Sequence, residues 1–205
     1  MCWKNFLQKQ ETKNDADFFC RWLAVELAPT IYGEKPGTLL NLMNTPKFLM
    51  KTLWLEYGTC LLAASNIEWI VLKDEPGSIK ILFYRTDLMN NYVGDRPIRC
   101  FLESIGYHAD MNLQEMLLYF KERFQLKCPH ELGIFLGIPL KDVMGFMGMS
   151  EECRTCQGMW HIYGDPVSSL GIMKRMEDAK SQVAGWMMEG YAAADVLCGA
   201  FGRIA

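Results

Sequence analysis

The chain has 205 residues, of which 50% are hydrophobic and 22% charged, and its formal net charge is −3. This composition excludes a disordered protein and supports a core of ordinary size, so we expect one domain over residues 1–205. The small negative charge offers no broad basic surface, which argues against a nucleic-acid partner. No apolar stretch is long enough for a bilayer or a secretory signal, so we expect a cytoplasmic protein without a membrane partner.

The first predicted element is a helix that follows a polar N-terminal segment. Residues 1–14 are expected to be poorly ordered. Asp15 or Asp17 can cap a helix that runs to about Leu27. This helix should end near Ala28, because the proline that follows disfavours a helical residue before it.

The middle of the chain is predicted to contain short helices and one hairpin. Two prolines and two glycines in 28–37 predict a structured loop. Apolar residues at helical spacing predict a helix over 46–57. Two β-rich runs, 67–72 and 79–84, enclose Pro76-Gly77, in which proline sets φ and glycine accepts a positive φ. Three more helices are expected. One runs from 86 to 90 or 92, one covers 97–104, and one begins at a cap at Asn112 and ends at about 124.

Residues 128–143 are the most informative stretch of the sequence. Pro129 occupies a first-turn position and Pro139 follows a glycine, which predicts two short helices that meet at a tight corner. His130 and Glu131 would then lie on the first turn of the first helix. Free backbone N–H groups and the positive end of the helix dipole make such a turn suitable for chemistry or ligand contact.

The last part of the chain is predicted to hold a third strand and a long helical region. The strand is expected within 157–163. The helical region covers 166–201, with Gly185 and Gly190 weakening its continuity. Together the elements predict an α+β fold, in which several α-helices pack on a small antiparallel sheet of about three strands. The three strands are 67–72, 79–84 and 159–163.

The eight cysteines are scattered, and without a signal peptide they are expected to be reduced thiols, most of them small core fillers. Cys153 and Cys156 form a Cys-x-x-Cys motif, which can be redox-active or bind a metal. With Cys128, His130 and His161 they form a set that could close a zinc site. There is no second such motif, and a redox motif usually begins a helix after a strand. We therefore assign no metal and keep this set as candidate ligands only.

Two polar groups are candidates for a functional site. His130 and Glu131 are candidate catalytic residues, although adjacent helical residues do not face each other, so a purely structural capping role stays open. Arg85, at a strand end, and Lys35, in the loop 28–37, could together hold a carboxylate or phosphate. The alternative is that Arg85 pairs with Glu131 or Asp142 and fastens the hairpin to the helices.

No motif identifies a cofactor. Fourteen methionines suggest haem or copper, but methionine fills irregular cores and adaptable surfaces far more often than it binds metal. The sequence has no Cys-x-x-Cys-His, Gly-x-Gly-x-x-Gly, Walker A or Gly-x-Ser-x-Gly motif. The cofactor is therefore left unknown.

Several segments between about residues 20 and 180 together form a recognisable pattern. They are Ala28-Pro29-Thr30 with Gly33, Lys35 and Pro36; Tyr84-Arg85; Gly106-Tyr107; Pro129 to Gly137 with Pro139-Leu140, Asp142-Val143 and Gly145-Phe146; and Trp160-His161-Ile162-Tyr163. The pattern resembles a bacterial family of unknown function, DUF3793, found in anaerobic Firmicutes. The chain differs at Leu27, Met159 and His161, where the family often has Cys, Tyr and Lys. The resemblance implies a small α/β fold in the bacterial cytosol and no catalytic assignment.

Two classes of function remain open. The first is a small-ligand-binding or enzymatic protein, with a polar pocket where the loop 28–37, Arg85 and the His130 helix start converge. Its candidate ligand-binding residues are Thr30, Lys35, Arg85, His130 and Tyr163. The second is an interaction or regulatory module, in which these residues are structural and a methionine and aromatic surface contacts a partner. Polar, proline-bounded motifs that are distant in sequence favour the first class. The sequence decides neither enzymatic activity nor oligomeric state.

Overall fold

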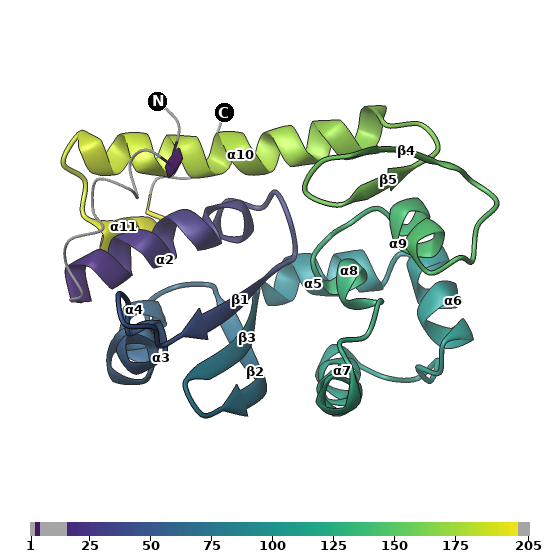
Figure 1. Ribbon diagram of the computed structural model, residues 1–205, viewed down its shortest axis with the longest axis horizontal. Helices are drawn as coiled ribbons and strands as arrows, with labels where there is room; N and C mark the ends of the chain where they lie inside the picture. Colours follow the sequence, from purple (N-terminus) through teal and green to yellow (C-terminus); the bar gives the residue numbers. More distant parts are fainter. Residues whose placement is uncertain (1–2, 5–15, 201–205) are drawn as a thin grey trace.

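The computed structural model describes residues 3–4 and 16–200. Most of the N-terminal segment predicted to be poorly ordered, and the end of the predicted C-terminal helical region, lie outside the described residues. Helices surround a three-stranded antiparallel sheet, and a separate two-stranded hairpin lies apart from it (Figure 1). The predicted α+β class with a small antiparallel sheet is confirmed.

The three-stranded sheet has the order β1-β3-β2, and both pairs are antiparallel. Its strands are β1 (Gly37–Met43), β2 (Glu68–Glu75) and β3 (Ser78–Tyr84). The predicted hairpin is β2–β3, and Gly77 in its turn has a φ of 81°. The predicted third strand, 159–163, does not belong to this sheet, because β1 occupies the other side of β3.

The strand β1 was missed because its apolar pattern is ambiguous. Leu40 and Leu42 enter one core, while the adjacent Leu39 packs against the other. Two leucines in succession break the period-two alternation that would have indicated a half-buried strand, and they fit a helix equally well. Pairing with β3 decides the conformation, since Gly37 lies opposite Tyr84 and Leu42 opposite Ile79.

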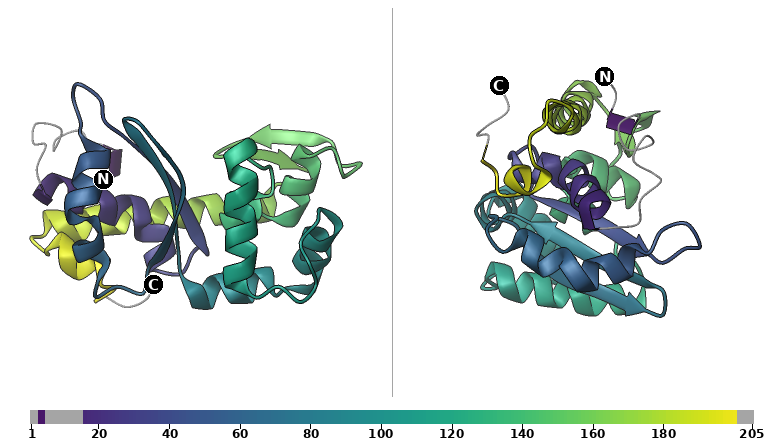
Figure 2. Two further views of the ribbon diagram at one scale, coloured as in Figure 1. Left: turned by 90° about the horizontal axis from the view of Figure 1, so that it is seen from below. Right: turned by 90° about the vertical axis from the view of Figure 1, so that its left-hand side faces the viewer.

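The central strand β3 is buried on both faces. Ile79, Ile81 and Phe83 point into one core, and Leu82 and Tyr84 point into the other. A strand covered on both faces has a nearly continuous apolar sequence. Figure 2 shows the sheet between two groups of helices, with α2 and α3 on one side and α7 on the other. The fold is therefore a helix–sheet–helix sandwich.

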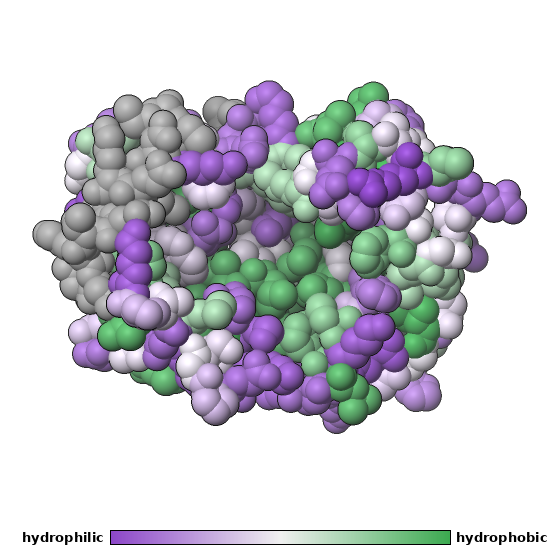
Figure 3. All heavy atoms as spheres, in the orientation of Figure 1, coloured by the Kyte–Doolittle hydropathy of each residue, from purple (hydrophilic) through white to green (hydrophobic). Residues whose placement is uncertain are grey.

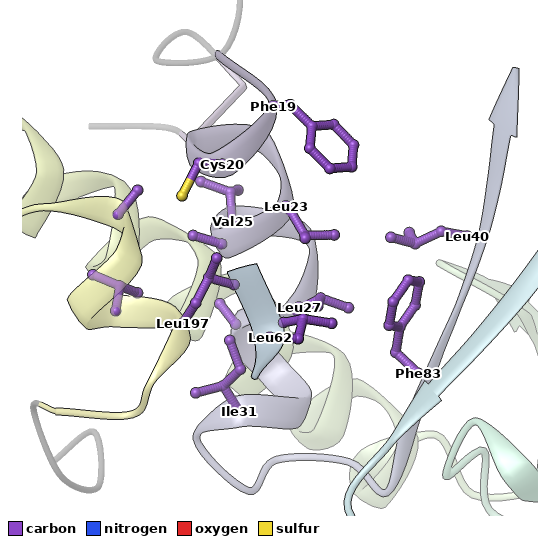
Figure 4. Close-up of a cluster of buried hydrophobic side chains, with 14 of the residues drawn as sticks. Phe19, Cys20, Leu23, Val25, Leu27, Ile31, Leu40, Leu62, Phe83 and Leu197 are labelled. Atoms are coloured by element: carbon purple, nitrogen blue, oxygen red, sulfur yellow. The ribbon is translucent and has the colours of Figure 1, made fainter. Parts of the chain in front are cut away.

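The first core lies between the sheet and the N- and C-terminal helices. In Figure 4, Leu23 and Leu27 of α2 point toward Leu40 and Phe83 of the sheet, while Leu197 approaches from the other side of α2. Burial on several sides makes α2 the central helix of this core. The elements are α2 (Ala16–Ile31), α3 (Met50–Leu53), the π-helical turn η1 (Trp54–Gly58), α4 (Thr59–Leu62), α10 (Val167–Met188) and α11 (Ala193–Leu197).

The helix α2 does not end at Ala28 as predicted but continues through Pro29 to Ile31. Proline removes one backbone donor, yet these last residues are buried against the rest of the core, so packing outweighs the local preference. The carbonyl of Pro29 accepts hydrogen bonds from the N–H groups of Glu34 and Lys35, which closes the helix end. The predicted loop is consequently shorter than 28–37.

The helix predicted over 46–57 begins later, at Met50, and runs through η1 to Leu62. A Cβ atom at Gly58 would lie 2.1 Å from the ring of Trp54. The glycine therefore allows the Trp54 indole to lie against its own helix, within edge contact of Phe83 at a centroid distance of 5.1 Å. Trp54 and Gly58 are the first and last residues of the π-helical turn.

The second core lies on the opposite face of the sheet. The helices predicted after the hairpin are confirmed, and Asn112 and Glu115 form a capping box at the start of α7. The predicted pair of short helices around the tight corner is also present, although His130 and Glu131 precede the first of them. The elements are α5 (Thr86–Val93), α6 (Arg96–Ser104), α7 (Leu113–Leu126), α8 (Leu132–Phe135) and α9 (Leu140–Phe146).

The hairpin formed by β4 (Arg154–Gln157) and β5 (His161–Tyr163) is separate from the main sheet. The strand predicted within 157–163 is thus split by a turn and pairs locally. The long C-terminal helical region is broken at Gly190, whose φ is 100°. Leu170, expected on the buried stripe of α10, is 47% exposed.

The described cysteines are free thiols, as predicted, but most are not core fillers. Cys20 is buried, whereas Cys60, Cys100 and Cys198 are exposed. On α6 the buried face is set by Ile98, Phe101 and Leu102, and position 100 is turned away from it. Scattered cysteines have no periodicity that would have shown which face they occupy.

Candidate functional site

A cavity of about 580 Å³ lies between α8, α9 and the β4–β5 hairpin. Figure 3 shows the face of the molecule drawn in Figure 1, with hydrophobic side chains gathered near its middle and to the right, where α8 and α9 lie. Most of the cavity wall is apolar, and a few polar side chains face it. The lining residues are Lys127, Cys128, Pro129, His130, Leu132, Gly133, Leu136, Ile138, Asp142, Val143, Phe146, Gln157, Met159, Trp160 and His161.

Two glycines allow the walls of this cavity to approach one another. A Cβ atom at Gly133 would lie 2.7 Å from Cγ2 of Val143, so glycine is needed for the contact between α8 and α9. A Cβ atom at Gly145 would lie 2.3 Å from the Tyr163 ring, so glycine is also needed where β5 packs on α9. The three elements are therefore held in direct contact.

Asp142 fixes the hairpin against α9 and α10. Its side chain is buried and accepts four hydrogen bonds. The donors are the Trp160 indole N–H at 2.8 Å, the Ser169 hydroxyl at 2.5 Å, the Tyr163 backbone N–H at 2.9 Å and the Lys141 ammonium at 2.8 Å. These four hydrogen bonds position one wall of the cavity. They also engage the N–H of Trp160, which is the only hydrogen-bond donor of an indole ring.

The pKa of Asp142 reflects these contacts. Burial by itself raises this pKa, but the hydrogen bonds from Lys141, Ser169, the Tyr163 backbone and Trp160 outweigh burial and lower it below the ordinary value of 3.8. Asp142 is therefore an ionised structural carboxylate, and its charge is balanced by Lys141 rather than offered to the cavity.

Two of the three histidines face the cavity. The ring centroid of Phe146 lies 5.2 Å from that of His130 and 6.1 Å from that of His161. His130 is exposed and His161 is intermediate in burial, while Phe146 is 51% exposed. Among residues 3–4 and 16–200, neither imidazole has a hydrogen-bond partner, so both are available to a ligand.

Glu131 points away from His130 into a separate contact. Its side chain is 1% exposed, and Oε1 accepts hydrogen bonds from Arg123 Nε at 2.5 Å and from the Tyr107 hydroxyl at 3.4 Å. Burial, and then the charge of Glu131, raise the pKa of Tyr107, which keeps the phenol neutral and able to donate. The candidate catalytic pair is therefore not an acid–base pair, and Glu131 is a structural residue.

The cysteine and histidine candidates do not form a metal site. Burial, and then the charge of Glu131, raise the pKa of Cys128, which disfavours the thiolate that a nucleophile or a metal ligand requires. Cys153 and Cys156 lie at β4, and Cys153 is exposed. In the described part of the chain, no three His, Cys, Asp or Glu side chains are close enough to hold a metal ion.

Arg85 does not reach either of the carboxylates predicted as its partners. Its Nε donates to Asp87 at 3.0 Å, and its Nη1 donates to the Ile31 carbonyl at 3.0 Å. Asp87 lies two residues away on the first turn of α5, so it satisfies the guanidinium locally, while Glu131 and Asp142 are occupied by other donors. The predicted pairing was wrong, and Arg85 instead ties α2 to α5.

The other candidate ligand-binding residues also lie away from the cavity. Thr30 is buried and shares a hydrogen bond with the Thr38 hydroxyl at 2.7 Å. Lys35 lines a different cavity, of about 450 Å³, against α5 and α10, and burial lowers its pKa to about 8. The Tyr163 carbonyl accepts from Lys141 at 2.7 Å. The structure therefore brings His130 together with Cys128 and His161, but not with Arg85 or Lys35.

Sequence reasoning missed several residues of the cavity wall. Phe146, Gln157 and Met159 line it beside the histidines. Gly145-Phe146 forms the last two residues of the short helix α9, and a glycine beside an aromatic residue at a helix end was the available signal. Nothing in the sequence indicated that the hairpin would fold over this helix.

Comparison with known proteins adds a family but no activity. Within the described ranges, no helix combines the length and the apolar character that crossing a membrane requires. Neither the curated proteins nor the solved structures provide a match to the chain. The model of a family described as a protein of unknown function, DUF3793, matches residues 23–197. This match covers most of the sequence, and the chain therefore belongs to the DUF3793 family.

Proposed function

We propose that this protein binds a small ligand in the cavity between α8, α9 and the β4–β5 hairpin. The observation that carries the proposal is a pair of imidazoles, His130 and His161, that face an apolar cavity of about 580 Å³ without hydrogen-bond partners among the described residues. Ligand sites are typically concave and mainly apolar, with a few polar groups that fix orientation. This cavity has that character.

The rigidity of the cavity wall also supports a binding role. Asp142 fastens the hairpin through Trp160 and the Tyr163 backbone, and Gly133 and Gly145 set close contacts between the elements. A preformed site loses less conformational entropy when a ligand binds than a site that must first assemble. No reaction is assigned, because the nearest carboxylates are already engaged by other residues.

A thermal-shift screen tests the proposal with the third histidine as a matched control. The screen covers organic acids, amines, nucleotides, flavins and neutral aromatic compounds, and a ligand is expected to raise the melting temperature of the parent. His130→Ala and His161→Ala should reduce that shift. His108→Ala removes an exposed imidazole that does not line the cavity, so it should leave the shift unchanged.

The stability of the variants separates binding from folding. His130 is exposed and makes no side-chain hydrogen bond among the described residues, so His130→Ala should unfold within about 0.5 kcal/mol of the parent. Ligand shifts that are equal in the parent, His130→Ala and His161→Ala would place binding elsewhere. The absence of any shift across the screen would remove support for the proposal.

A second candidate is an interaction module, and the apolar side chains near the cavity favour it. Phe146, Met149 and Met159 are 51%, 42% and 50% exposed, and Leu126 is 91% exposed. Exposed apolar groups of this kind often mark contact surfaces. A photo-reactive residue at position 149, used in the native cells, should crosslink to one recurrent protein. A lack of recurrent adducts, together with a positive ligand screen, would decide for the first candidate.

A further inference from the structure

The charges around the cavity indicate what kind of ligand it can hold. Asp142 is the only carboxylate among the lining residues, and its four donors include the Lys141 ammonium. Glu131 lies beside the segment 127–130 but is paired with Arg123. Lys127 lines the cavity, is exposed, and has no ion-pair partner among residues 3–4 and 16–200. The cavity therefore presents positive charge that no neighbouring carboxylate neutralises.

The hydrogen-bonding groups that face the cavity also favour an anionic ligand. The imidazoles of His130 and His161 are unpartnered within the described residues and can donate. Gln157 uses its amide oxygen to accept a hydrogen bond from Arg154 at 2.8 Å, which leaves its N–H₂ group as the free end. The raised pKa of Cys128 keeps that thiol protonated. The polar groups facing the cavity are thus mainly donors, and donors complement an anion.

The rest of the cavity wall is apolar, so a complementary ligand needs an apolar part. The indole N–H of Trp160 is already used by Asp142, so the cavity receives the ring of Trp160 and not its donor. Phe146 and Met159 are half exposed at the cavity, and burying them against a ligand would remove apolar surface from water. A small hydrated anion alone would leave this surface exposed.

We infer that the cavity takes a hydrophobic carboxylate, whose ring or branched chain lies on Phe146 and Trp160 and whose carboxylate meets Lys127 and His130. This inference rests on the proposed binding function and adds the chemical class of the ligand. Lys127 contributes a long-range attraction and His130 a directional donor. A cationic ligand would meet Lys127 without a compensating carboxylate.

Four probes of related shape test the class by isothermal titration calorimetry. They are 4-phenylbutanoate, its neutral amide, the corresponding amine 4-phenylbutylamine, and butanoate, which lacks the ring. We expect 4-phenylbutanoate to bind about five- to tenfold more tightly than the amide, because an exposed ion pair and one charge-assisted hydrogen bond contribute at that level. The amine and butanoate should bind more weakly still.

Variants of two lysines, one that follows the end of α7 and one within it, identify the cation. Lys127→Ala should bring the dissociation constants of the acid and the amide together by weakening the acid alone. Lys121→Ala, on α7 but not in the cavity wall, should leave the ratio unchanged. Raising the salt concentration should weaken the acid and not the amide.

The outcomes separate this inference from the proposed function. Equal binding of acid and amide, or tighter binding of the amine, overturns the anion class while the cavity remains a binding site. An acid preference that survives Lys127→Ala together with His130→Ala overturns the assignment of those two residues. If none of the four probes binds while a compound that is not a hydrophobic carboxylate does in the thermal-shift screen, the class is wrong and the binding function stands. If nothing in either experiment binds, both fail.

Discussion

Arg123 and Glu131 form an ion pair with 2.5 Å between Nε and Oε1, and this pair joins the last turn of α7 to the turn before α8. The carboxylate is almost fully buried, whereas the Arg123 side chain is 35% exposed. Tyr107, which follows α6, donates to the same oxygen. Glu131 therefore connects three segments of the second core, which explains its place in the sequence without any catalytic role.

Removal of Arg123 should destabilise the protein more than neutralisation of Glu131. Arg123→Ala leaves a buried carboxylate without its cation, and we expect a loss of about 2–3 kcal/mol, below the range for fully buried pairs because Arg123 is partly exposed. Glu131→Gln keeps the shape and should cost about 1–2 kcal/mol. Urea denaturation of both single variants and the double variant measures the coupling, and strictly additive losses would contradict a direct pair.

Asp142→Asn should lower stability in a pH-dependent way. The amide cannot accept from all four donors, so we expect a loss of about 2–4 kcal/mol at pH 7. Because the folded-state pKa of Asp142 is lower than its ordinary value of 3.8, the ionised carboxylate stabilises the fold above that value. Its contribution is lost as the pH falls through the lower, folded-state value.

The measurement is the difference in unfolding free energy between the parent and Asp142→Asn from pH 7 to pH 2.5. This difference should be constant above about pH 5 and should shrink below about pH 4. Asp110→Asn is the control, since Asp110 is exposed and no side-chain hydrogen bond or ion pair of Asp110 occurs among the described residues. A difference that does not change with pH would show that Asp142 is not ionised in the folded protein.

Two glycines in helices should respond to alanine in opposite directions. Gly145→Ala places a methyl group 2.3 Å from the Tyr163 ring, so we expect a loss of about 1–3 kcal/mol and a displaced hairpin. Gly185→Ala, in α10, meets nothing within 4 Å and should stabilise by about 0.5–1 kcal/mol through helix propensity. Thermal and urea unfolding of both variants check the sign, and a stabilised Gly145→Ala would contradict the close packing of β5 on α9.

Local signals in the sequence predicted the elements better than their partners. Pro76-Gly77 and its flanking β-rich runs gave the β2–β3 hairpin, and Asn112 marked the start of α7. The segment 161–163 was correctly expected to be a strand, but its register with 154–157 depends on a short turn with no strong signature. The strand β1 was missed because its apolar pattern fits a helix equally well and its pairing with β3 is a long-range contact.

The candidate site was predicted only in part. His130 lies in a cavity wall, and the proposed zinc set had already grouped it with Cys128 and His161. The alternative that paired Arg85 with Glu131 or Asp142 was wrong, because the sequence does not show that Asp87, two residues away, meets Arg85. The apolar wall depends on how the hairpin folds over α9, which follows from the contacts of Asp142 and from no local motif.

Lys35→Met should make the protein more stable at neutral pH. Lys35 is partly buried, and burial, reinforced by the charge of Lys180 and partly offset by that of Glu26, lowers its pKa from 10.5 to about 8. Between these two values the unfolded chain binds more protons than the folded one, so the stability of the parent rises with pH across this interval. Below pH 8 the cost of holding a charged amine is fully present, and methionine removes it.

We expect the variant to be more stable by about 1–2 kcal/mol at pH 7, with the advantage shrinking between pH 8 and pH 10.5. Urea denaturation at pH 7, 8.5 and 10 measures the difference from the parent, and Lys174→Met, on the exposed surface of α10, should show no such trend. A variant that is less stable than the parent at every pH would mean that the Lys35 amine makes a favourable contact which outweighs its burial.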